Sequence, residues 1–152
     1  MITIQISEAF NSQIKASLLE QAANLTLTHL SVPENTSMTI AITGDQEIQQ
    51  LNRQFRDIDA PTDVLSFPAG YPDPESGTTY LGDIIISVPQ AALQAERGGH
   101  PLEDELQLLV VHGCLHLLGH DHAEPAEKTE MWAAQKAILE QLHISVEIIS
   151  EV

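Results

Sequence analysis

The stretch VVHGCLHLLGHDH, residues 110–122, carries most of the information about how this chain folds and what it does. It lies at the end of a leucine- and valine-rich segment, and that composition predicts a buried helix. Within the helix His112 and His116 are four residues apart, so their imidazoles project from one face about one turn apart. Two imidazoles placed in this way can share one metal ion.

A third histidine follows the helix at a spacing that suits the same ion. Gly119 permits the left-handed turn that ends a helix, and the chain can then bring His122 back over the same face. Three neutral imidazoles leave one tetrahedral position of zinc open for water, which is typical of a catalytic site. We therefore expect one zinc ion per chain, which lowers the pKa of its water from ~15.7 to ~7.

The alternative is that these histidines are ordinary residues of a buried helix. For a single histidine that reading is favoured, but three of them at H-x-x-x-H-x-x-G-x-x-H spacing would place costly polar rings on apolar ground without a metal to compensate. His120 is expected to be solvent-exposed rather than a ligand. Asp121 is expected either to accept a hydrogen bond from a metal-binding histidine or to shape the loop, and Cys114 is expected in the core.

The same spacing occurs in the metzincin metallopeptidases, whose motif carries a glutamate general base directly after the first histidine. Here Gly113 occupies that position. A peptidase of that type would lack the group that deprotonates the attacking water. Proteolysis is therefore the second hypothesis rather than the first.

Length and composition predict one intracellular domain that spans residues 1–152. Apolar residues make up 43% of the chain, enough for a core, and the single cysteine excludes an intrachain disulfide. Met1 leads directly into ITIQIS, which resembles neither a signal peptide nor a membrane span. We expect a cytoplasmic protein with no membrane partner.

The charge of the chain counts against a nucleic-acid substrate at long range. There are 22 acidic and 6 basic side chains, which give a formal net charge of -16. Screening at cellular salt limits the reach of distant charge to ~8 Å, so a metal and clustered arginines can still form a local positive site.

Hydrophobic periodicity predicts an α+β fold, with a small mixed sheet packed against helices. The short run at 64–67 lies between prolines, so we expect it near a sheet edge, followed by a loop at 71–79. The run at 81–88 is expected to be a strand buried on both faces. The expected strands are 2–6, 38–42, 64–67 and 81–88, and the expected helices are 8–30, one that begins at 44–45 and carries Ile48, Leu51 and Phe55 on one side, 89–97, 101–118 and 125–142.

Three blocks of this sequence resemble the YbeY family of bacterial endoribonucleases. They are HGCLHLLGHDH at 112–122, LNRQFRDIDAPTDVLSFP at 51–68 and LGDIIIS at 81–87, in the usual family order. The resemblance implies an α+β fold with zinc in a cleft and cleavage of single-stranded RNA. It also implies roles in ribosomal RNA maturation, notably at the 3′ end of the small-subunit 16S RNA, and in ribosome quality control, with the small subunit and ribosome assembly factors as partners.

By position, Arg56 matches the functional arginine of that family, and His112, His116 and His122 match its metal ligands. A guanidinium offers a planar fork of donors suited to a phosphate or to charge that develops in a phosphodiester transition state. Arg53 is expected to add a second RNA contact, although a solvated role is equally compatible with its position. Without the resemblance, Arg56 reads as a surface arginine paired with a neighbouring aspartate.

Three hypotheses follow from the residues together. The first is a metal-dependent endoribonuclease, the second a zinc metallopeptidase without the usual glutamate, and the third a noncatalytic zinc-stabilised module that binds ribosomes. The missing glutamate separates the first from the second. The open fourth position of the metal argues against the third.

Overall fold

The computed structural model describes residues 1–72, 77–120 and 124–144, which form one sheet and the helices around it. Along the chain the elements are β1 (Ile2–Ile6), the short 3-10 helix η1 (Glu8–Phe10), α1 (Ala16–His29), β2 (Thr36–Thr43), α2 (Asp45–Arg56), β3 (Val64–Pro72), β4 (Thr79–Ser87), α3 (Val88–Gly98), α4 (Leu102–Leu117) and α5 (Pro125–Gln141).

The sheet is mixed, with the strand order β1-β2-β4-β3. β1 and β2 are parallel, as are β2 and β4, whereas β3 runs antiparallel to β4 at the edge. The α+β prediction and the edge position of β3 are both confirmed. An edge strand tolerates Pro68 because the missing N–H need not donate to a neighbour.

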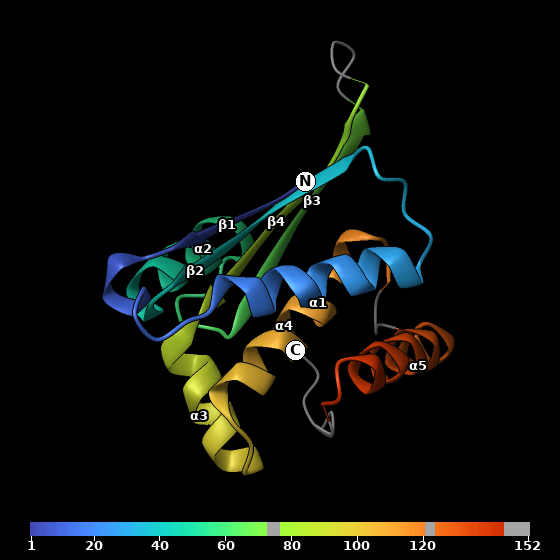
Figure 1. The fold of residues 1–152 in the computed structure, drawn as a ribbon. Helices are drawn as coiled ribbons and strands as arrows, with labels where there is room; N and C mark the ends of the chain where they lie inside the picture. The colour runs from blue at the N-terminus through green and yellow to red at the C-terminus, as the bar shows by residue number, and fades with distance from the viewer. Residues whose placement is uncertain (73–76, 121–123, 145–152) are drawn as a thin grey trace.

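The two faces of the sheet differ. Ile40, Ile42, Ile84 and Ile86 are almost completely buried on one face, whereas the alternate residues, such as Thr39, are only half-buried. Figure 1 shows α1, α4 and α5 on the same side of the sheet, below the strands, with α2 at its left end. The helices therefore cover one face, and the opposite face is more open.

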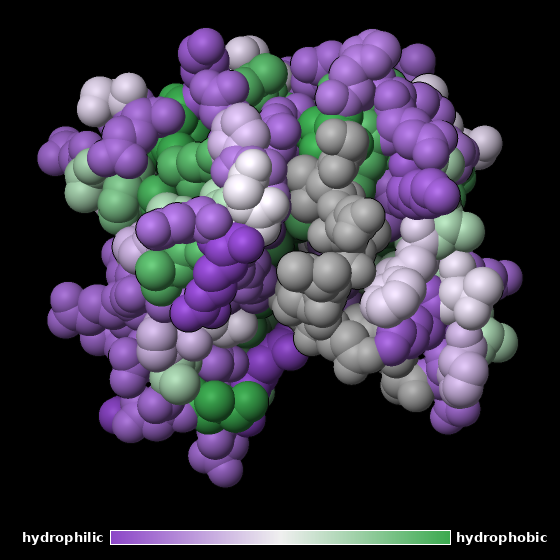
Figure 2. Space-filling view, turned by 90° about the horizontal axis from the view of Figure 1, so that it is seen from below, coloured by the Kyte–Doolittle hydropathy of each residue, from purple (hydrophilic) through white to green (hydrophobic). Residues whose placement is uncertain are grey.

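Helix α4 is the centre of the core. All but four of its sixteen residues are buried below about one tenth exposure, and it contacts α1, α3, α5, β3 and β4. Purple hydrophilic residues predominate on the outer surface seen in Figure 2, with smaller green patches between them. Among the described residues, none of the helices is both long and apolar enough to cross a membrane.

The expected boundaries are wrong in two places. The helix expected over 8–30 divides into η1 and α1, with a turn around Asn11 and Ser12, whose side chains favour turns over helix interiors. The loop expected over 71–79 is shorter, because β3 and β4 remain paired out to Pro72 and Thr79. Gly82 makes that pairing possible, since a Cβ there would lie 2.1 Å from the Phe67 carbonyl oxygen.

Candidate active site

His112 and His116 face each other on α4. Their Nε2 atoms are 3.1 Å apart, and the rings meet nearly edge to face with centroids 4.6 Å apart. Two Zn–N bonds of about 2.0–2.1 Å at a tetrahedral angle would place the nitrogens about 3.3 Å apart. The observed separation is within a few tenths of an ångström of that value, so the pair fits a shared metal ion.

Gln135 on α5 orients the buried member of this pair. The Nδ1 of His112 lies 2.9 Å from the Oε1 of Gln135, and both side chains are buried. An amide oxygen can only accept, so with this orientation Nδ1 carries the hydrogen and donates it. The Nε2 of His112 then keeps its lone pair, which is the form that binds a metal.

The other end of the Gln135 side chain is not hydrogen-bonded within the described part of the chain. Its Nε2 is buried and has no hydrogen-bond partner among the described residues. An unpaired buried amide N–H costs free energy, so this end of the side chain is destabilising while the other end holds His112. Gln135 was not predicted. Its signal in the sequence is a glutamine between Met131 and Ile138 on the buried side of a helix.

The end of α4 turns as the sequence predicted. Gly119 has φ +95°, and the N–H groups of Gly119 and His120 donate to the carbonyls of His116 and Leu115 at 3.0 and 2.9 Å. This is the double bond pattern of a Schellman cap. It folds His120 back onto the helix, so this residue is half-buried rather than exposed as expected.

His122 and Asp121 lie outside the described residues. Within the described ranges, no group of three or more histidine, cysteine, aspartate or glutamate side chains is arranged to hold a metal. The described part of the centre is therefore the pair His112 and His116 with Gln135 behind it.

The packing around Gly113 disfavours the glutamate that a metallopeptidase carries at this position. A Cβ at Gly113 would lie 2.9 Å from the Cδ1 of Ile84 and 3.0 Å from its Cγ2. The position faces the central strand β4, so a longer side chain would have to displace a fully buried isoleucine. The glycine permits close packing of helix and sheet, and a carboxylate here would be desolvated.

Cys114 is a core residue, as predicted. It is completely buried, and its Sγ lies 3.8 Å from the Sδ of Met38. Burial raises the pKa of the thiol to about 12. Since thiolate is the reactive form, this cysteine has no role in the chemistry of the site.

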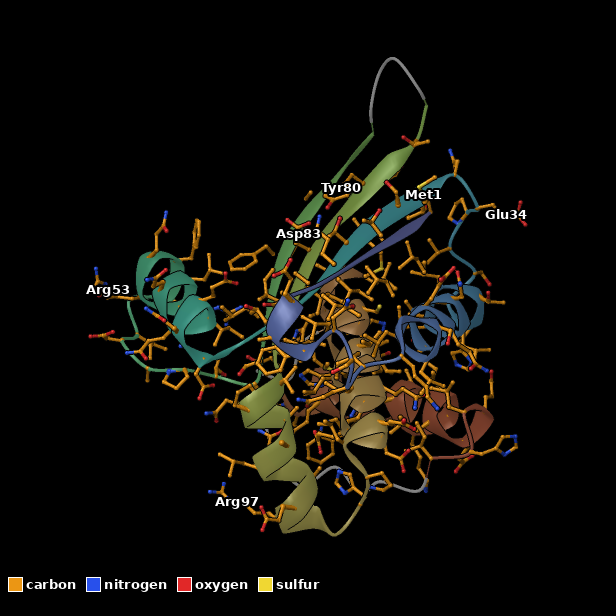
Figure 3. All side chains as sticks on the ribbon, turned by 60° about the vertical axis from the view of Figure 1, so that its left-hand side comes forward. Met1, Glu34, Arg53, Tyr80, Asp83 and Arg97 are labelled. Atoms are coloured by element: carbon orange, nitrogen blue, oxygen red, sulfur yellow. The ribbon has the colours of Figure 1, made fainter. Side chains whose placement is uncertain are left out.

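Arg53 and Arg56 lie in the last turn of α2, with both side chains exposed. The helix ends at Asp57, which has φ +58°, and the Asp59 carboxylate accepts a hydrogen bond from Gln49. Neither arginine forms an ion pair with any described residue, so the expected alternative of a pairing with a neighbouring aspartate is not seen. Figure 3 shows Arg53 projecting outward from α2, on the opposite side of the sheet from α1.

The loop from α2 to β3 is held by buried polar contacts. The carboxylate of Asp63 accepts hydrogen bonds from the backbone N–H of Val64 at 2.8 Å and from the side chain of Gln94 at 3.0 Å. The side chain of Asn52 donates to the carbonyl of Ala60 at 2.9 Å. Asp63 therefore has a structural role, and the loop fixes where α2 ends relative to β3.

The edge strand β3 lies between the arginines and the histidines. Gly113 packs over Ile84, and Ile84 pairs with Ser66 on β3, so the segment of α4 that carries His112 packs near this part of the sheet. The next residue, Phe67, points to the other face and contacts Phe55 of α2. The helix turn that carries the two arginines and the helix that carries the two histidines therefore lie on opposite faces of the sheet.

The mixed sheet, the central buried helix with two facing imidazoles and the exposed arginines at the end of α2 define an α+β protein with a candidate metal centre. Comparison with known proteins identifies the family. The model of the family described as "Endoribonuclease YbeY" matches residues 2–143, and the chain belongs to this family. The predicted class of enzyme, a hydrolase that acts on RNA, is confirmed at the level of the family.

Relatives match over nearly the whole chain. A protein named "Endoribonuclease YbeY" from Roseiflexus sp. (strain RS-1) is 41% identical, over 96% of this chain and 95% of its own. One of the same name from Dehalococcoides mccartyi (strain CBDB1) is 38% identical, over 93% and 92%. The solution structure of TM1509 from Thermotoga maritima has a TM-score of 0.62 at 30% identity, over 93% of this chain and 89% of that one.

Proposed function

We propose that this chain, as a single domain over residues 1–152, is a zinc-dependent endoribonuclease selective for single strands. Its proposed role is maturation of ribosomal RNA in the cytoplasm, at the 3′ end of the small-subunit 16S RNA, and ribosome quality control. Its partners would be the small subunit and ribosome assembly factors. The family supports the reaction class, and the supporting observation within the site is the pair of facing Nε2 atoms 3.1 Å apart.

The residues proposed to hold one zinc ion are His112, His116 and His122. The first two have the separation that a shared ion requires, and Gln135 keeps His112 in the metal-binding tautomer. When bound by three histidines, zinc supplies Lewis-acid chemistry and lowers the pKa of the water it binds.

The arginines are proposed to act on the RNA. Arg56 would contact the phosphate and stabilise the negative charge that develops during cleavage, while Arg53 would hold a neighbouring phosphate. Both guanidinium groups are exposed and unpaired among the described residues, so neither has to break an ion pair to bind RNA. An arginine fork also suits phosphate geometry better than a lysine ammonium does.

The experiment that tests this function compares three substrates. Metal-loaded protein is incubated with single-stranded RNA, duplex RNA and casein, alongside a His116→Ala variant. We expect cleavage of the single-stranded RNA only, and loss of that cleavage in the variant. Cleavage of casein that depends on His116, with RNA intact, would instead support the peptidase.

A further inference from the structure

Phe55 is an apolar aromatic side chain in an unusual position. It lies in the last turn of α2 and is 59% exposed, more than any other large apolar side chain of the described residues except Met1. Burial along this side of the helix decreases steadily, from the fully buried Ile48 through the half-buried Leu51 to Phe55. An exposed aromatic ring on a chain with only six Phe, Tyr and Trp residues needs an explanation.

The ring is oriented although it is exposed. It meets the ring of Phe67 in an edge-to-face contact, with centroids 5.2 Å apart and planes at 64°. Such contacts favour one arrangement of the two rings. Phe55 is therefore a partly fixed, solvent-facing aromatic surface rather than a freely rotating side chain.

Two of the few cationic side chains of this protein are neighbours of this ring in the sequence. The chain has only six lysines and arginines against 22 acidic residues, and two of the six, Arg53 and Arg56, flank Phe55 in the last turn of its helix. The carboxylate of Asp83, which is opposite Phe67 in the sheet, accepts the hydroxyl hydrogen of Tyr80. A negatively charged ligand with a flat apolar part fits this combination.

The position of the ring along the sheet connects it with the histidines. Phe67, which supports Phe55, follows Ser66, and Ser66 pairs with the Ile84 that contacts the α4 helix beside His112. β3 is the edge strand, so a ligand that passes over this edge can reach both faces of the sheet.

We propose that Phe55 is the base-stacking platform for the RNA substrate, with Arg53 and Arg56 on the phosphates next to the stacked base. Aromatic side chains stack on any exposed base, but the bases of a duplex are already stacked on each other. The platform would thus contribute directly to selection of single strands. This inference rests on the proposed RNA cleavage, and it adds a substrate-binding residue that is neither a metal ligand nor an arginine.

The first test is a kinetic comparison of variants. Phe55→Leu keeps an apolar side chain but removes the ring, and we expect its KM for single-stranded RNA to rise about tenfold with a much smaller change in kcat. Phe55→Tyr keeps the ring and should remain near wild type. Leu93→Ala, at an exposed leucine on α3, is the matched control and should not change KM. An unchanged KM in Phe55→Leu, with metal content and unfolding temperature as in wild type, would overturn the inference.

The second test does not depend on cleavage. The tryptophan fluorescence of a Phe55→Trp variant, corrected for Trp132 with the wild type, is titrated with a single-stranded RNA, the same strand with abasic nucleotides, and a duplex. We expect quenching by the intact single strand only. If the wild type leaves RNA intact while this quenching occurs, the proposed function fails and the binding inference stands. If the wild type cleaves RNA but position 55 affects neither KM nor fluorescence, the inference alone fails.

Discussion

The Nδ1 of His112 lies 2.9 Å from the Oε1 of Gln135, across the contact between α4 and α5. This hydrogen bond joins residues 23 positions apart and sets which nitrogen of His112 is free to bind a metal. The α5 helix is therefore part of the candidate metal centre, although it supplies no proposed ligand.

The first prediction concerns this hydrogen bond. Gln135→Leu should weaken zinc binding about 10- to 100-fold. This range is typical when a metal-binding histidine loses the hydrogen-bond partner of its other ring nitrogen. Zinc affinity is measured by competition with a chromogenic chelator. The control is Gln107→Leu. Gln107 is also a buried glutamine, but it lies on α4 and its amide donates to the carbonyl of Glu103. Equal zinc affinity of Gln135→Leu and the wild type would show that the bond is only structural.

The second prediction separates RNA recognition from metal binding. Arg56→Ala should keep its metal but cleave RNA about 100-fold more slowly, because a charge-assisted contact in the transition state is worth a few kcal/mol. Arg56→Lys should recover part of the rate, since it keeps the charge but not the fork. Arg97→Ala, on the separate helix α3 (Figure 3), is the control. Wild-type cleavage by Arg56→Ala with zinc intact would remove Arg56 from the site.

The third prediction concerns the packing of α4 on β4. Gly113→Ala gains up to about 1 kcal/mol of helix propensity, but it overpacks Ile84, which typically costs about 1–3 kcal/mol. We expect a net loss of unfolding free energy that Ile84→Val relieves, because valine lacks the Cδ1 atom 2.9 Å from the new methyl group. Denaturant unfolding of both single variants and the double variant measures the coupling. Strictly additive losses would show that the two positions do not compete for space.

The fourth prediction is a dependence of stability on pH. Glu105 on α4 is buried, and its carboxylate lies 2.7 Å from the Nε2 of His100. Burial raises the pKa of Glu105 above its ordinary value of 4.5, although the hydrogen bond and charge of His100 act in the opposite direction. The folded state then holds the proton more tightly than the unfolded state, so stability falls as the pH rises through the raised pKa.

Glu105→Gln removes this titration but keeps an oxygen that can accept from His100. The free energy of unfolding of the variant minus that of the wild type should therefore rise with pH in the window just above 4.5. Urea unfolding at a series of pH values gives this difference. A constant or falling difference would contradict the assigned cause.

The sequence predicted the parts of the molecule that depend on local spacing. The four-residue interval of His112 and His116, the turn at Gly119 and the edge position of β3 each follow from helix period, glycine conformation or proline placement. Contacts between distant segments were not predictable in this way. The bond from His112 to Gln135 and the ring pair of Phe55 and Phe67 depend on how helices dock against the sheet and each other.

Two further features show the same limit. The apolar pattern of α2 predicts that Phe55 lies on the same side of the helix as Ile48 and Leu51. It does not predict that the last turn of the helix lies beyond the part of the molecule that buries this side, so the exposure of Phe55 is seen only in the structure. The pairing of β3 with β4 beyond Pro68 depends on Gly82, which has φ +137°. The need for glycine arises from the Phe67 carbonyl on the neighbouring strand, and the sequence of β4 alone does not show that contact.

The most direct test of the proposed metal centre is the metal content of the purified protein, measured by elemental analysis. The wild type should contain about one zinc ion per chain and should unfold at a lower temperature after chelation. His112→Ala, His116→Ala and His122→Ala should each lose the metal, whereas His29→Ala, at an exposed histidine on α1, should retain it. Full metal content in His112→Ala, His116→Ala and His122→Ala would contradict the assignment of these histidines as metal ligands.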